Sequence, residues 1–198
     1  CFDDSGNSVV EQQGGLVCKT AFPSMPIYFW NDPEGEKYQS AYFDVYPGVW
    51  HHGDYIYITP HGGIIMYGRS DATLNPGGVR IGTAEIYNVV ENMDEIDDSV
   101  IVGKKVDEDE QVVLFVKLKP GVELSEELIK KIRTNIRANC SPRHVPAIIR
   151  ECPDVPYTLN GKKVEVAVKK LIHGQEVKNR DALRNPESLD YFKSAEVY

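Results

Sequence analysis

The chain has 198 residues, of which 41% are hydrophobic, 26% charged and 10% aromatic, a composition typical of a globular protein that buries a core. A formal net charge of -8 repels phosphate backbones and anionic lipid, so we expect neither nucleic acid nor a membrane as a partner. No apolar run reaches the roughly 18 to 20 residues that cross a bilayer, and the first residues do not resemble a signal peptide. We therefore expect the chain to act in the cytosol.

Cysteine and histidine spacing gives no sign of a metal or redox site. The four cysteines lie far apart and form no Cys-x-x-Cys pair, and the five histidines miss the one-turn spacing of a helical metal site. We expect reduced thiols and no metal bound by these side chains.

The segment from Gly15 to Arg69 has the pattern of short strands and turns. Five prolines punctuate it and no helical period is present. Two apolar runs, residues 55–58 and 64–67, flank the turn Pro60-His61-Gly62-Gly63. This arrangement predicts a β-hairpin.

Helical periodicity begins after Gly68. Apolar residues recur at the spacing of one helix face from Ile86 to Met93, with Thr83 as the candidate N-cap. Two β-branched runs, residues 100–102 and 112–118, are joined by an acidic turn. They predict a second hairpin with one face against the helices.

The remaining helices and strand are predicted from residues that begin or end regular structure. Ser125 opens a helix whose first turn is acidic, and Ser141-Pro142 ends it. A short strand at residues 147–149 leads to the turn at Asn160-Gly161, and a last helix ends at Gly174.

The predicted fold class is α+β, with three parts. Residues 1–69 form a β-rich segment, and residues 70–174 form a compact domain with a central antiparallel sheet and flanking helices. Residues 175–198 are a polar tail.

Two stretches in the β-rich part and at its boundary could bind a nucleotide. In Trp50-His51-His52-Gly53-Asp54, the Asp54 carboxylate could accept hydrogen bonds from the vicinal hydroxyls of a ribose. In Gly68-Arg69-Ser70-Asp71, Arg69 could bind phosphate or ribose oxygens while Asp71 braces a turn. A structural turn and a surface loop are the alternatives.

Two further stretches carry glycines or a lysine at a turn. The adjacent Gly77 and Gly78, in Asn75-Pro76-Gly77-Gly78-Val79-Arg80, could line a narrow channel or simply form a hairpin turn. In Pro156-Tyr157-Thr158-Leu159-Asn160-Gly161-Lys162, the lysine could neutralise a carboxylate and a phosphoryl group in a cleft. A solvated surface lysine is the alternative.

Taken in this order, the four stretches resemble the late motifs of the adenylate-forming superfamily, which includes acyl-CoA synthetases, peptide-synthetase adenylation domains and luciferases. That superfamily has Tyr/Trp-x-Thr-Gly-Asp, Gly-Arg-x-Asp with a following glycine-and-arginine loop, and Pro-x-Thr-x-x-Gly-Lys. The resemblance covers nearly the whole chain. One departure is His52, where the family usually has threonine.

The resemblance implies that a carboxylate attacks the α-phosphate of ATP to give an acyl-adenylate, and that CoA then displaces AMP. Asp54 would bind the ribose hydroxyls, Arg69 the ribose and phosphate, and Arg80 a phosphate. Lys162 would be catalytic, bridging the acyl carboxylate and the α-phosphate.

For the thioester step, the resemblance implies rotation of the C-terminal domain about a hinge at Asp71. Gly77 and Gly78 would then line the pantetheine tunnel, and Arg137 would contact the CoA nucleotide.

Three further stretches, Phe22 to Pro26, Pro156 to Lys170 and Asn185 to Leu189, are similar to the acyl-CoA synthetases that activate acetoacetate. Two alternatives are left: the substrate is another short-chain acid, or the chain is an interaction module that kept the fold and lost the chemistry. A nucleotide-binding regulator is disfavoured because neither common phosphate-binding glycine motif is present.

The family binds ATP phosphates, adenine and Mg²⁺ through a large N-terminal domain, and no such motif precedes Gly14. We therefore expect a fragment whose partners are acetoacetate, ATP, CoA and its own N-terminal domain. Such a fragment would fold but would not adenylate acetoacetate alone.

Overall fold

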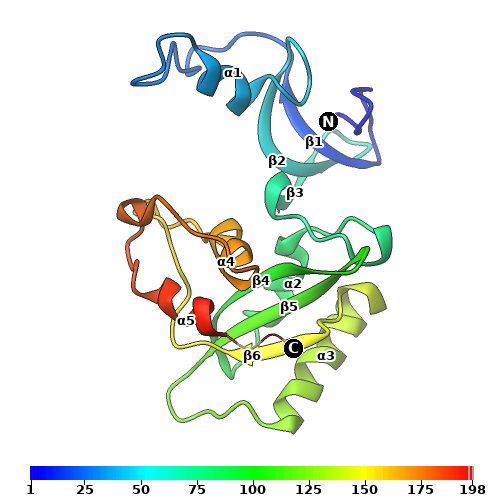
Figure 1. Ribbon diagram of the computed structural model, residues 1–198. Helices are drawn as coiled ribbons and strands as arrows, with labels where there is room; N and C mark the ends of the chain where they lie inside the picture. Colours follow the sequence, from blue (N-terminus) through cyan, green and yellow to red (C-terminus); the bar gives the residue numbers. More distant parts are fainter. Residues whose placement is uncertain (196, 198) are drawn as a thin grey trace. The chain divides into compact units, whose positions relative to one another are not determined.

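The computed structural model describes residues 1–195 and 197. Contacts within the chain divide it into two compact units, unit 1 at Cys1–Asp71 and unit 2 at Ala72–Tyr198 (Figure 1). The boundary drawn from the sequence, after Arg69, lies two residues earlier. In the described part of the chain, no helix combines the length and hydropathy needed to cross a membrane.

Unit 1 is built on an antiparallel three-stranded sheet in the order β1-β2-β3. The strands are β1 (Gln13–Cys18), β2 (Trp50–Ile58) and β3 (Ile64–Arg69). The β2–β3 turn is closed by hydrogen bonds between Thr59 and the glycines that follow it, and Gly62 has a φ of 79°. The hairpin predicted from the sequence is confirmed.

A short helix, α1 (Glu36–Tyr42), lies where the sequence analysis predicted none. Its first amides donate to the Asp32 carboxylate, from Lys37 at 3.1 Å and from Tyr38 at 2.9 Å. Tyr42 stacks on Trp50 of β2 with ring centroids 3.7 Å apart. The prediction was wrong because aromatic packing and the hydrogen bonds to Asp32, rather than an apolar period, stabilise this helix.

Unit 2 contains a mixed sheet in the order β4-β5-β6. Strands β4 (Ile96–Val106) and β5 (Asp109–Leu118) form the predicted antiparallel hairpin. Strand β6 (Ile148–Glu151) pairs with β5 in parallel. A parallel pair needs a long crossover, and α3 (Glu126–Asn139) supplies it. The α+β class is confirmed, and the sheet is mixed rather than wholly antiparallel.

Helix boundaries in unit 2 depend on side-chain caps. Ser125 caps α3 as predicted, because its hydroxyl accepts from the Leu128 amide at 3.2 Å. The N-cap of α2 (Thr83–Val90) is Gly82, so the assignment of Thr83 was wrong. Glu85 reaches back to accept from the Gly82 amide at 3.2 Å, and this bond places Thr83 inside the helix.

The hairpin of unit 2 is covered on both faces. Its side chains alternate, so Ile101 and Leu114 face a core with α2 and α3, while Val102 and Phe115 face a second core. That second core includes α4 (Glu165–Ile172) and α5 (Ser188–Ser194), which lie together beside the sheet (Figure 1). Each face of one strand pair therefore anchors two helices.

The segment described from the sequence as a polar tail contributes to this second core. Leu183, Leu189 and Phe192 are buried there, and the Phe192 ring meets Phe115 edge-on at 5.0 Å. Strand β5 thus packs directly against the last helix. The tail belongs structurally to unit 2.

A polar contact ties the same tail to the sheet. Asp154 accepts from Lys117 of β5 at 3.1 Å and from the Asn185 side chain. Burial alone would raise the pKa of Asp154, but the hydrogen bonds from Asn185 and Lys117 outweigh it and hold the pKa below 3.8. The ionised carboxylate is therefore favoured by folding.

Phe192→Ala should lower the free energy of unfolding by about 3–5 kcal/mol, because it removes a fully buried ring and leaves a cavity against Phe115. Urea unfolding followed by circular dichroism measures this. Leu159→Ala is the control, since Leu159 is 67% exposed and should change stability by less than about 0.5 kcal/mol. An equally small change for Phe192→Ala would contradict the packing of the tail.

Asp154 should make stability fall in acid. Because its folded pKa lies below 3.8, its contribution is present above that value and is lost as pH falls through the folded pKa. Urea unfolding between about pH 5 and pH 2 should show the Asp154→Asn variant losing less stability than the parent chain. The exposed Glu123→Gln serves as the control. Parallel curves for Asp154→Asn and the parent would refute the prediction.

Candidate functional site

Asp54 and Arg69 face each other on neighbouring strands of unit 1, where β2 and β3 pair. The Asp54 side chain is 20% exposed, and its Oδ2 lies 3.3 Å from His52 Nε2. The residue that departs from the family motif, His52, therefore contacts the carboxylate predicted to bind ribose. One carboxylate oxygen is engaged in this contact.

Arg69 forms a two-point contact with Asp71. Its Nε and Nη2 donate to the two carboxylate oxygens of Asp71 at 3.3 and 3.2 Å. A Cβ on Gly53 would lie 3.2 Å from the Arg69 guanidinium, so a glycine there lets the guanidinium lie against β2. Both side chains of the pair are about half exposed, which leaves them accessible to a ligand.

These residues border a hollow of about 400 Å³ in unit 1. It is lined by Ala41, Tyr42, His51, His52, Gly53, Arg69, Ser70 and Asp71. Burial, and then the positive charge of Arg69, lower the pKa of His51, so His51 is neutral at pH 7. Arg69 supplies a permanent positive charge at this hollow, where it is paired with the Asp71 carboxylate.

The glycine loop of unit 2 is a tight turn held by the tip of the β4–β5 hairpin. Gly77 and Gly78 have φ values of 58° and 74°, a region that favours glycine. The Gly77 amide donates to Asp109 at 2.7 Å, and the Asn75 amide donates to Glu110 at 2.8 Å. The positive φ angles account for both glycines as turn residues.

The two glycines differ in their surroundings. A Cβ on Gly77 would meet Arg143 Nη1 at 2.5 Å, whereas one on Gly78 would meet nothing within 4 Å. Arg143 also donates to the Gly77 carbonyl at 3.4 Å. The loop therefore has one face closed by Arg143 and an open face at Gly78, where another molecule can approach the backbone.

Lys162 lies on a turn that the residues of its own motif close. The Thr158 amide donates to the Lys162 carbonyl at 2.8 Å, and the Lys162 amide donates to the Thr158 hydroxyl at 3.0 Å. Gly161 supplies a φ of 75°. The threonine and glycine thus shape the turn, and the Lys162 residue is exposed.

The two predicted phosphate-binding arginines are exposed in unit 2. Arg80 follows the glycine loop, and Arg137 lies on α3. Arg137 borders a shallow hollow of about 280 Å³ together with Lys130 and Arg133. Three basic side chains on one helix face favour an anionic ligand, although Arg133 also donates to the Ala147 carbonyl at 2.8 Å.

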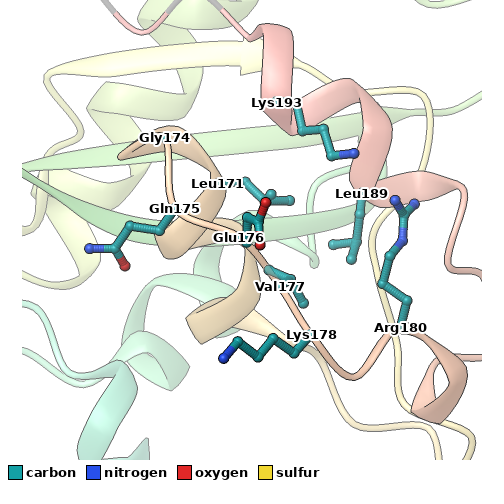
Figure 2. A pocket seen from close by; sticks show the side chains of 9 residues that line it. All are labelled: Leu171, Gly174, Gln175, Glu176, Val177, Lys178, Arg180, Leu189 and Lys193. Atoms are coloured by element: carbon teal, nitrogen blue, oxygen red, sulfur yellow. The ribbon is translucent and has the colours of Figure 1, made fainter.

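A larger hollow of unit 2, of about 520 Å³, lies away from all the predicted residues. Figure 2 shows side chains from the end of α4, the following tail and α5 around it. Its Arg180 and Lys193 both pair with Asp190, at 3.0 and 3.3 Å. Arg180 and Lys193 thus share one carboxylate, and Lys178 adds a third basic side chain to the lining.

Each unit carries part of the predicted site. Asp54, Arg69 and Asp71 come together in unit 1, while the glycine loop, Arg137 and Lys162 occupy separate places in unit 2. Sequence reasoning missed Arg143, which closes the glycine loop, and Lys163, a largely covered lysine next to Lys162. Within residues 1–195 and 197, no group of three or more His, Cys, Asp or Glu side chains could hold a metal ion.

Comparison with known proteins identifies one family. Residues 85–162 match the AMP-binding enzyme C-terminal domain. The chain is 56% identical over 195 residues to acetoacetyl-coenzyme A synthetase of Rhizobium meliloti, which covers 98% of this chain and 30% of that protein. The rat acetoacetyl-CoA synthetase is 53% identical over 194 residues, covering 97% of this chain and 29% of the relative.

A solved structure agrees with this likeness. Acetoacetyl-CoA synthetase from Streptomyces lividans superposes with a TM-score of 0.91 and 43% identity, over 97% of this chain and 29% of that one. The chain spans about 30% of the length of the relatives it matches. The family resemblance inferred from the four motifs is confirmed: the chain belongs to the AMP-binding, adenylate-forming enzymes and corresponds to the C-terminal part of acetoacetyl-CoA synthetases.

Proposed function

We propose that the chain is the C-terminal part of an ATP-dependent acetoacetate-CoA ligase acting in the cytosol. The enzyme would convert acetoacetate, ATP and CoA to acetoacetyl-CoA, AMP and diphosphate through an acyl-adenylate. The relatives named above support the substrate. The observation that carries the proposal is the exposed Lys162 on a turn closed by the threonine of its own motif.

Lys162 would act in the first step. An acetoacetate carboxylate oxygen attacks the α-phosphorus, the bond to diphosphate breaks, and negative charge accumulates on the phosphoryl oxygens. An ammonium group between the two anions relieves their repulsion and stabilises the transition state by a few kcal/mol, roughly a hundred- to thousandfold in rate. The CoA thiolate then attacks the acyl carbonyl and AMP leaves.

Unit 1 would bind the nucleotide. The Asp54 carboxylate would accept from the ribose hydroxyls, and Arg69 would bind ribose and phosphate. Because Arg69 holds Asp71 through two hydrogen bonds, a phosphate that draws on Arg69 would compete with the contact that restrains the proposed hinge. Arg80 would add a further phosphate contact.

The open face of the glycine loop would serve the second step. Gly77 and Gly78 would border the pantetheine tunnel, and Arg137 would bind the CoA nucleotide beside Lys130. The N-terminal domain of the full enzyme would supply the acyl pocket and hold Mg²⁺ with the ATP phosphates.

A non-catalytic interaction module is the competing proposal. Asp54, Arg69 and Lys162 are all present and accessible to some degree, which favours the enzyme. The substrate can also be tested directly. ATP–diphosphate exchange, measured on the full enzyme with a panel of acids, distinguishes acetoacetate from another short-chain acid as the substrate.

In the full enzyme, Lys162→Ala should lower the rate of ATP–diphosphate exchange with acetoacetate by at least roughly a hundredfold, because the charge on the phosphoryl group is no longer neutralised. The matched control is Lys170→Ala, another exposed lysine of unit 2, which should leave the rate unchanged. Unimpaired exchange in Lys162→Ala would refute the proposed function. Diphosphate release by the 198-residue chain alone would show that it needs no N-terminal domain.

Gly78→Leu should slow thioester formation from supplied acetoacetyl-AMP by roughly a hundredfold while sparing adenylation, since the side chain would intrude on the open face of the loop. The matched control is Gly121→Leu. Gly121 has a φ of 83° with nothing within 4 Å, so the backbone strain is equal but no substrate is expected there. Equal loss in both variants would attribute the effect to strain and contradict the tunnel.

A further inference from the structure

Lys163 follows Lys162 directly but has the opposite environment. Its side chain is 16% exposed, whereas Lys162 is exposed. The Lys163 ammonium donates to Asp98 Oδ1 at 2.5 Å, to the Ser99 carbonyl at 2.6 Å and to Glu91 Oε1. All three donors of the ammonium group are therefore used inside unit 2.

Tyr157, at the other end of the lysine turn, reaches the same carboxylate. Its hydroxyl donates to Asp98 Oδ2 at 2.8 Å, and residues 157 and 163 form a β-bridge with each other. The two ends of the turn are thus fastened to one Asp98 side chain, through one oxygen each. We call Lys163, Asp98, Glu91 and Tyr157 the lysine-turn clamp.

The clamp rests on regular secondary structure. Asp98 belongs to β4, and Glu91 caps the end of α2 while accepting from the Ser99 hydroxyl at 2.7 Å. The ring of Tyr87, on α2, lies 4.5 Å from the Lys163 ammonium. Both acidic side chains therefore extend from regular secondary structure, and Glu91 is also bonded to Ser99.

The charge states suit a permanent anchor. Burial lowers the pKa of Lys163, but hydrogen bonds and charge from Asp98 and Glu91 outweigh it and raise the pKa above 10.5. Burial, together with Asp98, raises the pKa of Tyr157 to about 12. At neutral pH the lysine is charged and the tyrosine is a donor, as every contact of the clamp requires.

The tail segment supports the turn from another side. The Leu159 amide donates to the Ala182 carbonyl at 3.0 Å, and the Arg184 amide donates to the Tyr157 carbonyl at 2.9 Å. Asn185 accepts from the Tyr157 amide at 2.9 Å. The turn is therefore fixed at both ends while the Lys162 residue stays exposed.

We propose that Lys163 is a positioning residue that, through Asp98 and Glu91, orients the turn carrying Lys162 for adenylation. This inference rests on the proposed function. Without the Lys163 anchor, the turn would keep its own hydrogen bonds and those to the tail, but its end next to Lys162 would lose its side-chain contacts to Asp98 and Glu91. Lys162 would then sample more orientations, and each misplaced one would lower the effective concentration of the catalytic ammonium. Lys163 itself touches no reacting atom.

If Lys163 only stabilises the fold, its replacement should have a different effect on the two half-reactions than if it positions Lys162. Loss of folded protein would reduce adenylation and thioester formation together. Misplacement of Lys162 would reduce kcat for adenylation alone, leaving the KM for ATP and the thioester step from supplied acetoacetyl-AMP unchanged. The two half-reactions therefore separate the explanations.

The first experiment measures the turn in the 198-residue chain, independently of catalysis. Hydrogen exchange of the Thr158 and Lys162 amides should be about tenfold faster or more in Lys163→Met, with the amides of α3 unchanged. If Lys163→Met does not fold, Tyr157→Phe replaces it, because it is the milder change and removes only one neutral hydroxyl. Lys131→Met is the matched control, because it removes a lysine bonded to Glu95 at 2.5 Å elsewhere in unit 2.

The second experiment measures the half-reactions of the full enzyme. Lys163→Met and Tyr157→Phe should lower kcat for adenylation by roughly ten- to a hundredfold. Lys131→Met should not. Either of two results would overturn the positioning role: unchanged hydrogen exchange of the turn amides, or faster exchange with unchanged adenylation. In both cases the proposed function would stand as long as Lys162→Ala still loses the reaction. Full adenylation by Lys162→Ala would overturn the proposed function, and the positioning role with it.

Discussion

The β4–β5 hairpin is the constraint on which the rest of unit 2 depends. Its alternating side chains bury α2 and α3 on one face and α4 and α5 on the other, so strand pairing and both cores form together. The same hairpin supplies the polar groups that hold the functional loops. Asp109 and Glu110, at the tip, bind the glycine loop, while Asp98, near the base, binds the lysine turn.

This arrangement separates the two loops by a fixed length. Asp98 and Val106, which pairs with Asp109, are eight residue steps apart on β4, so the two anchors are separated by roughly 25 Å along the strand. The glycine loop and the lysine turn are therefore anchored toward opposite ends of the hairpin. A hinge at Asp71, as proposed, would let unit 2 present Lys162 in the first step and the glycine loop in the second.

Most regular elements of unit 2 follow from local sequence signals because each signal has a local physical cause. Ser125 caps α3 through its own hydroxyl, and the acidic turn separates two β-branched strands. Elements stabilised by distant partners could not be inferred in this way. Helix α1 depends on stacking with Trp50, and α5 depends on a contact between Phe192 and Phe115, 77 residues apart in the printed numbering. The segment after residue 175 looks polar in the sequence, yet its Leu183, Leu189 and Phe192 side chains are buried.

In the candidate site, too, the sequence does not show which distant partner a single residue will contact. Motif order is sufficient to single out Asp54, Arg69 and Lys162, but two consecutive lysines are chemically identical in the sequence. Their environments differ because Lys163, in the bridge between residues 157 and 163, bonds to Asp98 while Lys162 is exposed. Two carboxylates then bind one ammonium whose side chain is only 16% exposed, and together they offset the cost of covering its charge. A largely covered charge that is fully compensated can hold its neighbour in the open, so the lysine proposed as catalytic can be both exposed and ordered.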